Sequence, residues 1–142
     1  MSASEQRRRP LRSFGAVFAG VVVVIVLSLG TDAVMHASGV FPPMGAQMSD
    51  GLFVLATAYR TVYAIAGSWV AARLAPGRPM AHALALGVVG LILSVVGLVV
   101  TWNAGPELGP RWYPILLVVT ALPSAWVGGW IHAAQQPTAS RN

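Results

Sequence analysis

Cysteine and lysine are both absent from the sequence, and only 9% of its 142 residues are charged. The missing cysteine excludes disulfides, thiolate metal ligands, iron–sulfur clusters and a cysteine nucleophile. The charged fraction is far below the roughly 25% that is usual in soluble domains. Because 56% of the residues are hydrophobic, the composition indicates a surface that faces hydrocarbon rather than water.

Positive charge is in excess, and all nine basic residues are arginines, which gives a net charge of +5. The arginines are not grouped with aromatic side chains on a soluble face, so we expect no nucleic-acid partner. Arginine-rich flanks are instead typical of the cytoplasmic ends of membrane helices. The use of arginine without lysine, together with much Ala, Gly and Val, is associated with GC-rich bacterial genomes and favours a bacterial inner membrane.

Four apolar segments are each long enough to cross a bilayer, since roughly 20 helical residues span its ~30 Å core. Ser49 and Asp50 are capping candidates before the second segment, and Pro79 suits the first turn of the third. The sequence therefore predicts an all-α fold, an integral membrane four-helix bundle. The expected spans are residues 13–34, 51–74, 79–102 and 112–132.

The first apolar segment has a second interpretation, as a signal peptide cleaved near Ala37. A basic start followed by an apolar stretch fits that reading. The stretch is longer than the 7–15 residues usual for a signal core. We therefore expect a retained membrane anchor.

Arginine positions predict the orientation of the bundle. With the N-terminus inside, seven arginines flank the inner side and only Arg111 flanks the outer side, an asymmetry that favours N-in/C-in topology. Residues 1–12 then form a cytoplasmic basic segment, 13–134 the transmembrane domain and 135–142 a cytoplasmic tail. The seven inner arginines are Arg7, Arg8, Arg9, Arg12, Arg73, Arg78 and Arg141.

Small residues four positions apart occur in every expected helix. Helices in lipid associate through close backbone packing, which small residues permit. These pairs therefore predict a compact bundle. They are Ala16 and Gly20, Gly67 with Ala71 and Ala75, Ala83 and Gly87, Gly90 and Ser94, and Ala121 with Ala125 and Gly129.

Arg60 is the most informative residue, because the helical rise puts it about 13 Å into the second span. An arginine at that depth costs ~2.5–3.5 kcal/mol and needs a partner. We expect Asp32 as its counter-ion, with Glu107 in the outer loop ranked second. Tyr59 and Tyr63 flank Arg60 and complete the intramembrane polar candidates; both a structural and a functional role remain open.

Asp32 and His36 lie four residues apart and would share a helix face if the first helix continues that far. A carboxylate can orient an imidazole for proton transfer, although an interfacial helix end explains both residues equally. Met35, Met44 and Met48 offer thioether donors that suit Cu(I), but the sequence lacks a dense methionine repeat. We therefore expect no metal and no cofactor.

The sequence contains no phosphate-binding glycine loop, no paired catalytic carboxylates and no zinc-protease motif, so we expect a protein that is not an enzyme. The first functional hypothesis is an accessory, assembly or scaffold component of a membrane complex, with the lipid bilayer and a membrane-protein partner or a homo-oligomer around it. The alternative is a small oligomeric transporter or channel that uses Arg60 with Asp32 and the nearby tyrosines.

Overall fold

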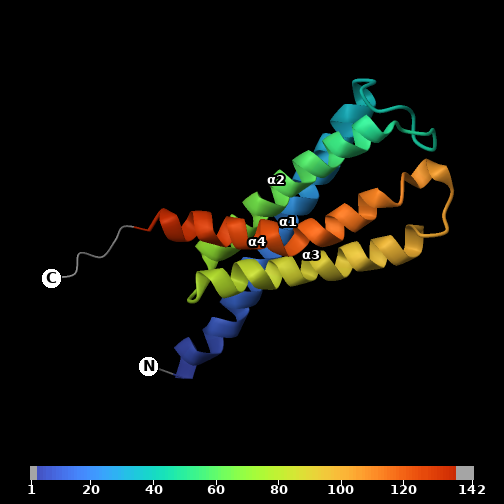
Figure 1. The fold of residues 1–142 in the computed structure, drawn as a ribbon. Helices are drawn as coiled ribbons and strands as arrows, with labels where there is room; N and C mark the ends of the chain where they lie inside the picture. Colours follow the sequence, from blue (N-terminus) through green and yellow to red (C-terminus); the bar gives the residue numbers. More distant parts are fainter. Residues whose placement is uncertain (1–2, 137–142) are drawn as a thin grey trace.

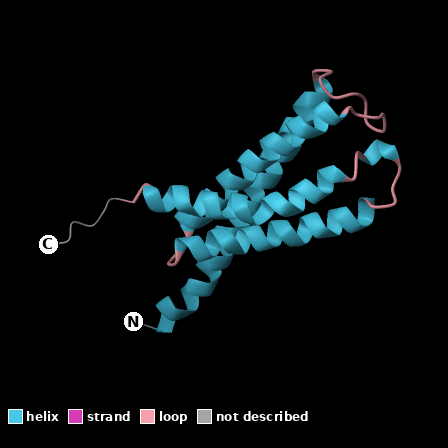
Figure 2. Ribbon diagram, viewed as in Figure 1, coloured by secondary structure: helices cyan, strands magenta, loops and turns pink. Residues whose placement is uncertain are grey.

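The computed structural model describes residues 3–136, which form four long α-helices and one short 3₁₀ helix, with no strand in that range (Figure 2). The expected all-α, four-helix architecture is confirmed for this part of the chain. Arg141 and most of the expected C-terminal tail lie outside the described residues. The elements are α1 (Ala3–Ala37), α2 (Asp50–Leu74), α3 (Pro79–Thr101), η1 (Pro106–Leu108) and α4 (Trp112–Ala134).

The helix boundaries match the predicted spans closely except in α1. This helix begins at Ala3, well before the expected membrane boundary, and runs to Ala37 with Pro10 inside it. Its early residues, which include Ala, Glu, Gln and Arg, are good helix formers. The helical path ends before Gly39, whose φ of 76° is left-handed. Asp32 and His36 therefore both lie on α1, as their proposed shared face requires.

The connection between α2 and α3 turns through Arg78, which has φ 50° and ψ 62°. Arg78 precedes Pro79, and a residue before proline is disfavoured in the right-handed helical region. The left-handed conformation lets α3 begin directly at the proline. His82 stabilises this start, because its Nδ1 donates a hydrogen bond to the Arg78 carbonyl oxygen at 3.1 Å.

The helices form two antiparallel hairpins, α1–α2 and α3–α4, that cross and then diverge (Figure 1). We call the region around the crossing, toward the 75–78 connection, the closed half. The other region, where the hairpins diverge toward the 38–49 connection and η1, is the open half. The N-terminal turns of α1 extend past the other helices at the closed end (Figure 1).

Glycines bring the backbones together in the closed half. A Cβ on Gly20 would lie 2.6 Å from the Gly67 carbonyl oxygen, so α1 and α2 touch through their main chains. A Cβ on Gly128 would lie 2.7 Å from the Ser68 Cβ and 2.9 Å from the Trp69 backbone nitrogen. The close packing predicted from small residues is thus confirmed here.

Tryptophan and glutamine side chains join α2 to the end of α4 at the closed end. Trp69 Nε1 donates to Gln135 Oε1 at 2.8 Å, and the Arg73 guanidinium lies 5.3 Å from the Trp69 ring centre. His132 is only 6% exposed, with its Nε2 3.1 Å from Gln136 Nε2. This helix end is therefore packed rather than open.

Within residues 3–136, three helical stretches are long and apolar enough to cross a membrane: Arg9–Ala37, Pro79–Thr101 and Pro106–Ala134. α2 is not among them. Its middle carries Tyr59, Arg60 and Tyr63, and these polar side chains lower its hydropathy. Length and apolar composition therefore support a membrane span for α1, α3 and α4, and the α2 span remains a prediction.

Candidate functional site

A polar cluster joins α1 and α2 in the open half. Arg60 Nη2 donates to Asp32 Oδ2 at 2.5 Å, and the Tyr59 hydroxyl donates to the other oxygen of the same carboxylate. Both oxygens of Asp32 therefore carry a charged or phenolic donor. The predicted ion pair between Arg60 and Asp32 is confirmed.

The antiparallel packing of α1 on α2 explains how the cluster forms. Asp32 lies little more than one turn before the end of α1, and Arg60 lies nearly three turns after the start of α2. The long arginine stem spans the difference in depth. The side chains of Arg60 and Asp32 remain 34% and 23% exposed, so the pair is partly accessible.

The guanidinium of Arg60 is only partly used. Its Nε is buried without a hydrogen-bond partner, although Nη2 is paired with Asp32. Nε and Nη2 form the edge of the guanidinium that receives a carboxylate in the two-bond, side-on geometry. Asp32 thus accepts from one of the two nitrogens on that edge, Nη2, and leaves the other, Nε, without an acceptor.

Tyr63 has a different role from Tyr59. Its hydroxyl lies 2.7 Å from Thr31 Oγ1, one residue before Asp32, and its ring centre lies 5.7 Å from that of Tyr59. Tyr63 therefore links α2 to α1 beside the ion pair. Thr31 could not be singled out from the sequence, because a threonine in an apolar helix usually bonds to its own backbone.

A cavity of about 380 Å³ opens above the ion pair, and we call it the vestibule. The 38–49 connection and η1 supply much of its wall. Five of the six polar residues predicted from sequence line it, and Tyr63 does not. Its polar side chains are Asp32, His36, Tyr59, Arg60, Glu107 and Tyr113.

His36 lines the vestibule but does not pair with Asp32. Its Nδ1 donates to the Pro42 carbonyl oxygen at 2.8 Å, and its ring meets Phe41 edge-on at 5.4 Å. Phe41 is only 4% exposed. The contact therefore fastens the 38–49 connection over the end of α1, and the orientation of His36 by Asp32 that the spacing allowed does not occur.

Glu107 reaches the vestibule wall from η1. Its carboxylate folds back over Gly105, where an added Cβ would clash with it. The ion pair recorded for Arg60 is to Asp32, which agrees with the lower rank given to Glu107 as counter-ion. Glu107 instead adds a second negative charge near the entrance.

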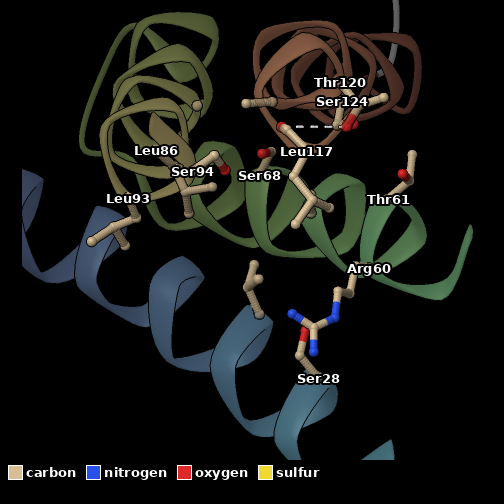
Figure 3. Close-up of a pocket in the computed structure, with 15 residues that line it drawn as sticks. Ser28, Arg60, Thr61, Ser68, Leu86, Leu93, Ser94, Leu117, Thr120 and Ser124 are labelled. Atoms are coloured by element: carbon tan, nitrogen blue, oxygen red, sulfur yellow. Dashed lines mark hydrogen bonds between the residues drawn. The ribbon is translucent and has the colours of Figure 1, made fainter. Parts of the chain in front are cut away.

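A second cavity, of about 210 Å³, lies on the bundle side of Arg60 (Figure 3). We call it the hydroxyl cavity, because every helix contributes a serine or threonine to a lining that is otherwise aliphatic. Ser68 is fully buried and its Oγ has no partner. The hydroxyl residues are Ser28, Thr61, Ser68, Ser94, Thr120 and Ser124.

A third hollow, the side groove of about 310 Å³, runs between α3 and α4 and is also lined by Arg60 and Tyr113. Arg60 therefore lines the vestibule, the hydroxyl cavity and the side groove alike. Tyr113 lines two of them, the vestibule and the side groove. The arrangement puts one cation where three cavities meet.

Ser68 is the site residue that sequence reasoning missed most clearly. Serines in apolar helices usually bond to their own backbone, as Thr120 does to Leu116 at 2.7 Å. A signal was present nonetheless, since Arg60, Ala64 and Ser68 are spaced by four and share one helix face. A hydroxyl two turns from Arg60 on that face marks the same cavity.

The described residues contain no group of three or more His, Asp or Glu side chains that could hold a metal ion. No protein-family model, curated protein or solved structure matches the chain. The chemistry of the site therefore follows from its own geometry. It offers a guanidinium with one unpaired N–H group, a carboxylate beside it and hydroxyl groups behind it, which together can bind a small polar molecule that accepts hydrogen bonds.

Proposed function

We propose that this is a non-enzymatic multi-pass membrane protein that binds, and as an oligomer transports, a small anionic or polar solute at Arg60. The position of Arg60 at the meeting point of three cavities carries this proposal. An arginine placed deep in an apolar bundle is costly, and a binding role accounts for that cost. The Nε of Arg60 is buried without a hydrogen-bond partner, and a bound solute could supply the acceptor that it lacks.

The proposed setting is a four-span bundle with both termini in the cytoplasm of a bacterium. The arginine asymmetry supports this orientation, which makes the open half the outer half. Reporters fused after Gly77 and after Asn142 should then give a cytoplasmic signal, and reporters near Gly45 and Gly105 an exterior signal. A cytoplasmic signal at Gly45 would refute the orientation.

The binding proposal is tested by thermal stabilisation of the purified protein with a panel of small anions and neutral polar solutes. At least one solute should raise the melting temperature of the native chain. Arg60→Gln should abolish this stabilisation, whereas Arg111→Gln should retain it, since Arg111 stacks on Trp102 at 5.2 Å instead of lining the vestibule. Equal responses from the two variants would refute a site at Arg60.

A second function, the accessory or assembly component, is favoured by the closed half. The backbone contacts at Gly20, Gly67 and Gly128 leave the helices tightly joined there, so solute passage would require the hairpins to move. Purification in mild detergent separates the two proposals. A co-purifying membrane protein supports the accessory function, and a homo-oligomer with solute flux in liposomes supports transport.

A further inference from the structure

The hydroxyl cavity has the composition of a site for a small amphiphile. Its lining combines aliphatic side chains, among them Val24, Leu86 and Leu93, with hydroxyl groups, and Arg60 lies at its edge. A purely inorganic anion would leave the aliphatic wall without a partner. A carboxylate on a short hydrocarbon body would satisfy both parts of the cavity.

The ion pair is built so that a second carboxylate could replace Asp32. Of the guanidinium nitrogens, Asp32 pairs with Nη2 alone, while the neighbouring Nε stays buried and unpaired. A ligand carboxylate that approached from the hydroxyl cavity could accept from both nitrogens at once, a stronger arrangement than a single bond. The guanidinium would then turn from Asp32 toward the ligand.

Charge balance decides what happens to Asp32. The pair of Arg60 and Asp32 is neutral, and an incoming anion would leave a net negative charge among apolar helices. Burying an unpaired charge is expensive, so Asp32 would take up a proton as it loses Arg60. The anion and the proton together add no net charge to the bundle.

The other titratable groups around Asp32 are accounted for element by element. α1 also carries His36, whose Nδ1 donates to the Pro42 carbonyl oxygen. α2 carries Tyr59 and Tyr63 besides Arg60. Glu107 lies on η1 and Tyr113 on α4. From α3, the cavities receive Ser94 and Thr101, which do not titrate. Asp32 is the carboxylate in direct contact with the guanidinium, so it is the group that the exchange protonates.

We propose that the hydroxyl cavity binds a small monocarboxylate with a short apolar body, which displaces Asp32 from Arg60 while Asp32 takes up one proton from solvent. This inference rests on the proposed solute site at Arg60 and names its substrate class. The coupling would make affinity strongest in acid. The affinity would fall about tenfold for each rise of one pH unit, because one proton is bound with each ligand.

Calorimetry with butyrate, on the full chain in phosphatidylcholine nanodiscs, tests the coupling. Between about pH 5.5 and about pH 7.5 the native chain should lose affinity about tenfold per unit and take up one proton per ligand. Asp32→Asn carries a neutral amide in place of the protonated carboxyl, so it should bind with an affinity independent of pH and without proton uptake. Asp50→Asn, the matched control at a carboxylate that lines none of the three cavities, should keep the native dependence.

The location of the site is tested by filling the cavity. A Cβ on Gly90 meets nothing within 4 Å although Gly90 lines the cavity, so Gly90→Leu should fold and abolish butyrate binding. Gly30 is equally open and lines none of the three cavities, so Gly30→Leu should bind as the native chain does. Circular dichroism confirms that both variants are folded.

The outcomes distinguish this inference from the function on which it rests. A pH dependence that persists in Asp32→Asn would overturn the proton exchange, because the protonated acid itself would then be the ligand. Native butyrate affinity in Gly90→Leu would overturn the cavity as the site. If other solutes bind through Arg60 but butyrate does not, the proposed function stands and the monocarboxylate is wrong; if nothing binds through Arg60, both fail.

Discussion

The closed and open halves of the bundle are made from the same kinds of residue but use them differently. In the closed half a Cβ on Gly67 or Gly128 would run into the neighbouring backbone. In the open half Gly90 and Gly97 face space, and each lines a cavity. Small residues thus bring helices together at one end and leave room between them at the other. The comparison shows that a spacing of small residues does not by itself identify a contact.

The candidate site follows the same division. The ion pair of Arg60 and Asp32 and the hydroxyl cavity both lie where the hairpins diverge. Ser68 lies on the boundary, because its Cβ packs near Gly128 while its hydroxyl lines the cavity. A rigid closed half can hold a polar site at a fixed depth while the open half remains accessible.

The largest expected loss of stability comes from placing a larger side chain in the closed half. Gly128→Val would push into the Ser68 side chain and the Trp69 backbone, and we expect a loss of about 3 kcal/mol in the free energy of unfolding, the upper end for overpacked sites. Unfolding in mixed micelles with rising SDS measures this. Gly90→Val is the matched control and should change stability by less than about 1 kcal/mol. Equal losses would contradict the division into two halves.

The ion pair should show the next largest effect. Asp32→Ala and Arg60→Ala each leave a partly buried charge without its partner, and we expect each to lose about 2 kcal/mol of unfolding free energy. The double variant should lose less than the sum of the two, since it removes both charges. Strictly additive losses in the same SDS titration would mean that the two side chains are not coupled.

Tyr63→Phe should lower the free energy of unfolding by less, about 1 kcal/mol, because it removes a single neutral hydrogen bond to Thr31. Thr31→Val tests the other side of that bond and should cost about the same. The double variant should cost no more than either one alone. A loss near zero for Tyr63→Phe would show that the hydroxyl contact does not help to join α1 to α2.

The smallest expected effect is a gain in the free energy of unfolding. Gly90→Ala replaces a flexible residue in the middle of α3 where an added methyl group meets nothing, so we expect a stabilisation of about 0.5 kcal/mol. Thermal unfolding followed by circular dichroism measures it. The same substitution at Gly67 should destabilise, because the new methyl group meets Val24 and the Gly20 carbonyl oxygen. A loss at both positions would place Gly90 in a contact.

The helices and the ion pair could be predicted from the sequence because they depend on local pattern. Apolar runs bounded by Ser49, Pro79 and the Pro-Gly turn set the ends of α2 and α3, and antiparallel neighbours bring Asp32 near Arg60. α1 extends beyond the expected membrane span 13–34 at both ends. The charged residues before position 13 mark the boundary of the apolar run, but arginine and glutamine favour helix, so the helix itself begins earlier.

The cavities could not be predicted in the same way. They arise because two hairpins diverge, and the crossing geometry depends on which small residues meet across helices that are far apart in sequence. The spacing of Gly90 and Ser94 looked like that of Ala83 and Gly87, yet a Cβ on Gly90 would meet nothing within 4 Å, whereas a Cβ on Gly87 would lie 2.4 Å from the Ala125 Cβ. Tyr113 and Ser68 became site residues only through that geometry.

The central claim is that Arg60 lies beneath a vestibule open to the outside, and cysteine labelling tests it most directly because the chain has no cysteine of its own. Met44 is 86% exposed and lines the vestibule, while Gly77 lies in the 75–78 connection of the closed half. A membrane-impermeant maleimide added to intact cells should label Met44→Cys and leave Gly77→Cys unlabelled until the membrane is opened. Labelling of Gly77→Cys in intact cells, with Met44→Cys protected, would contradict the account.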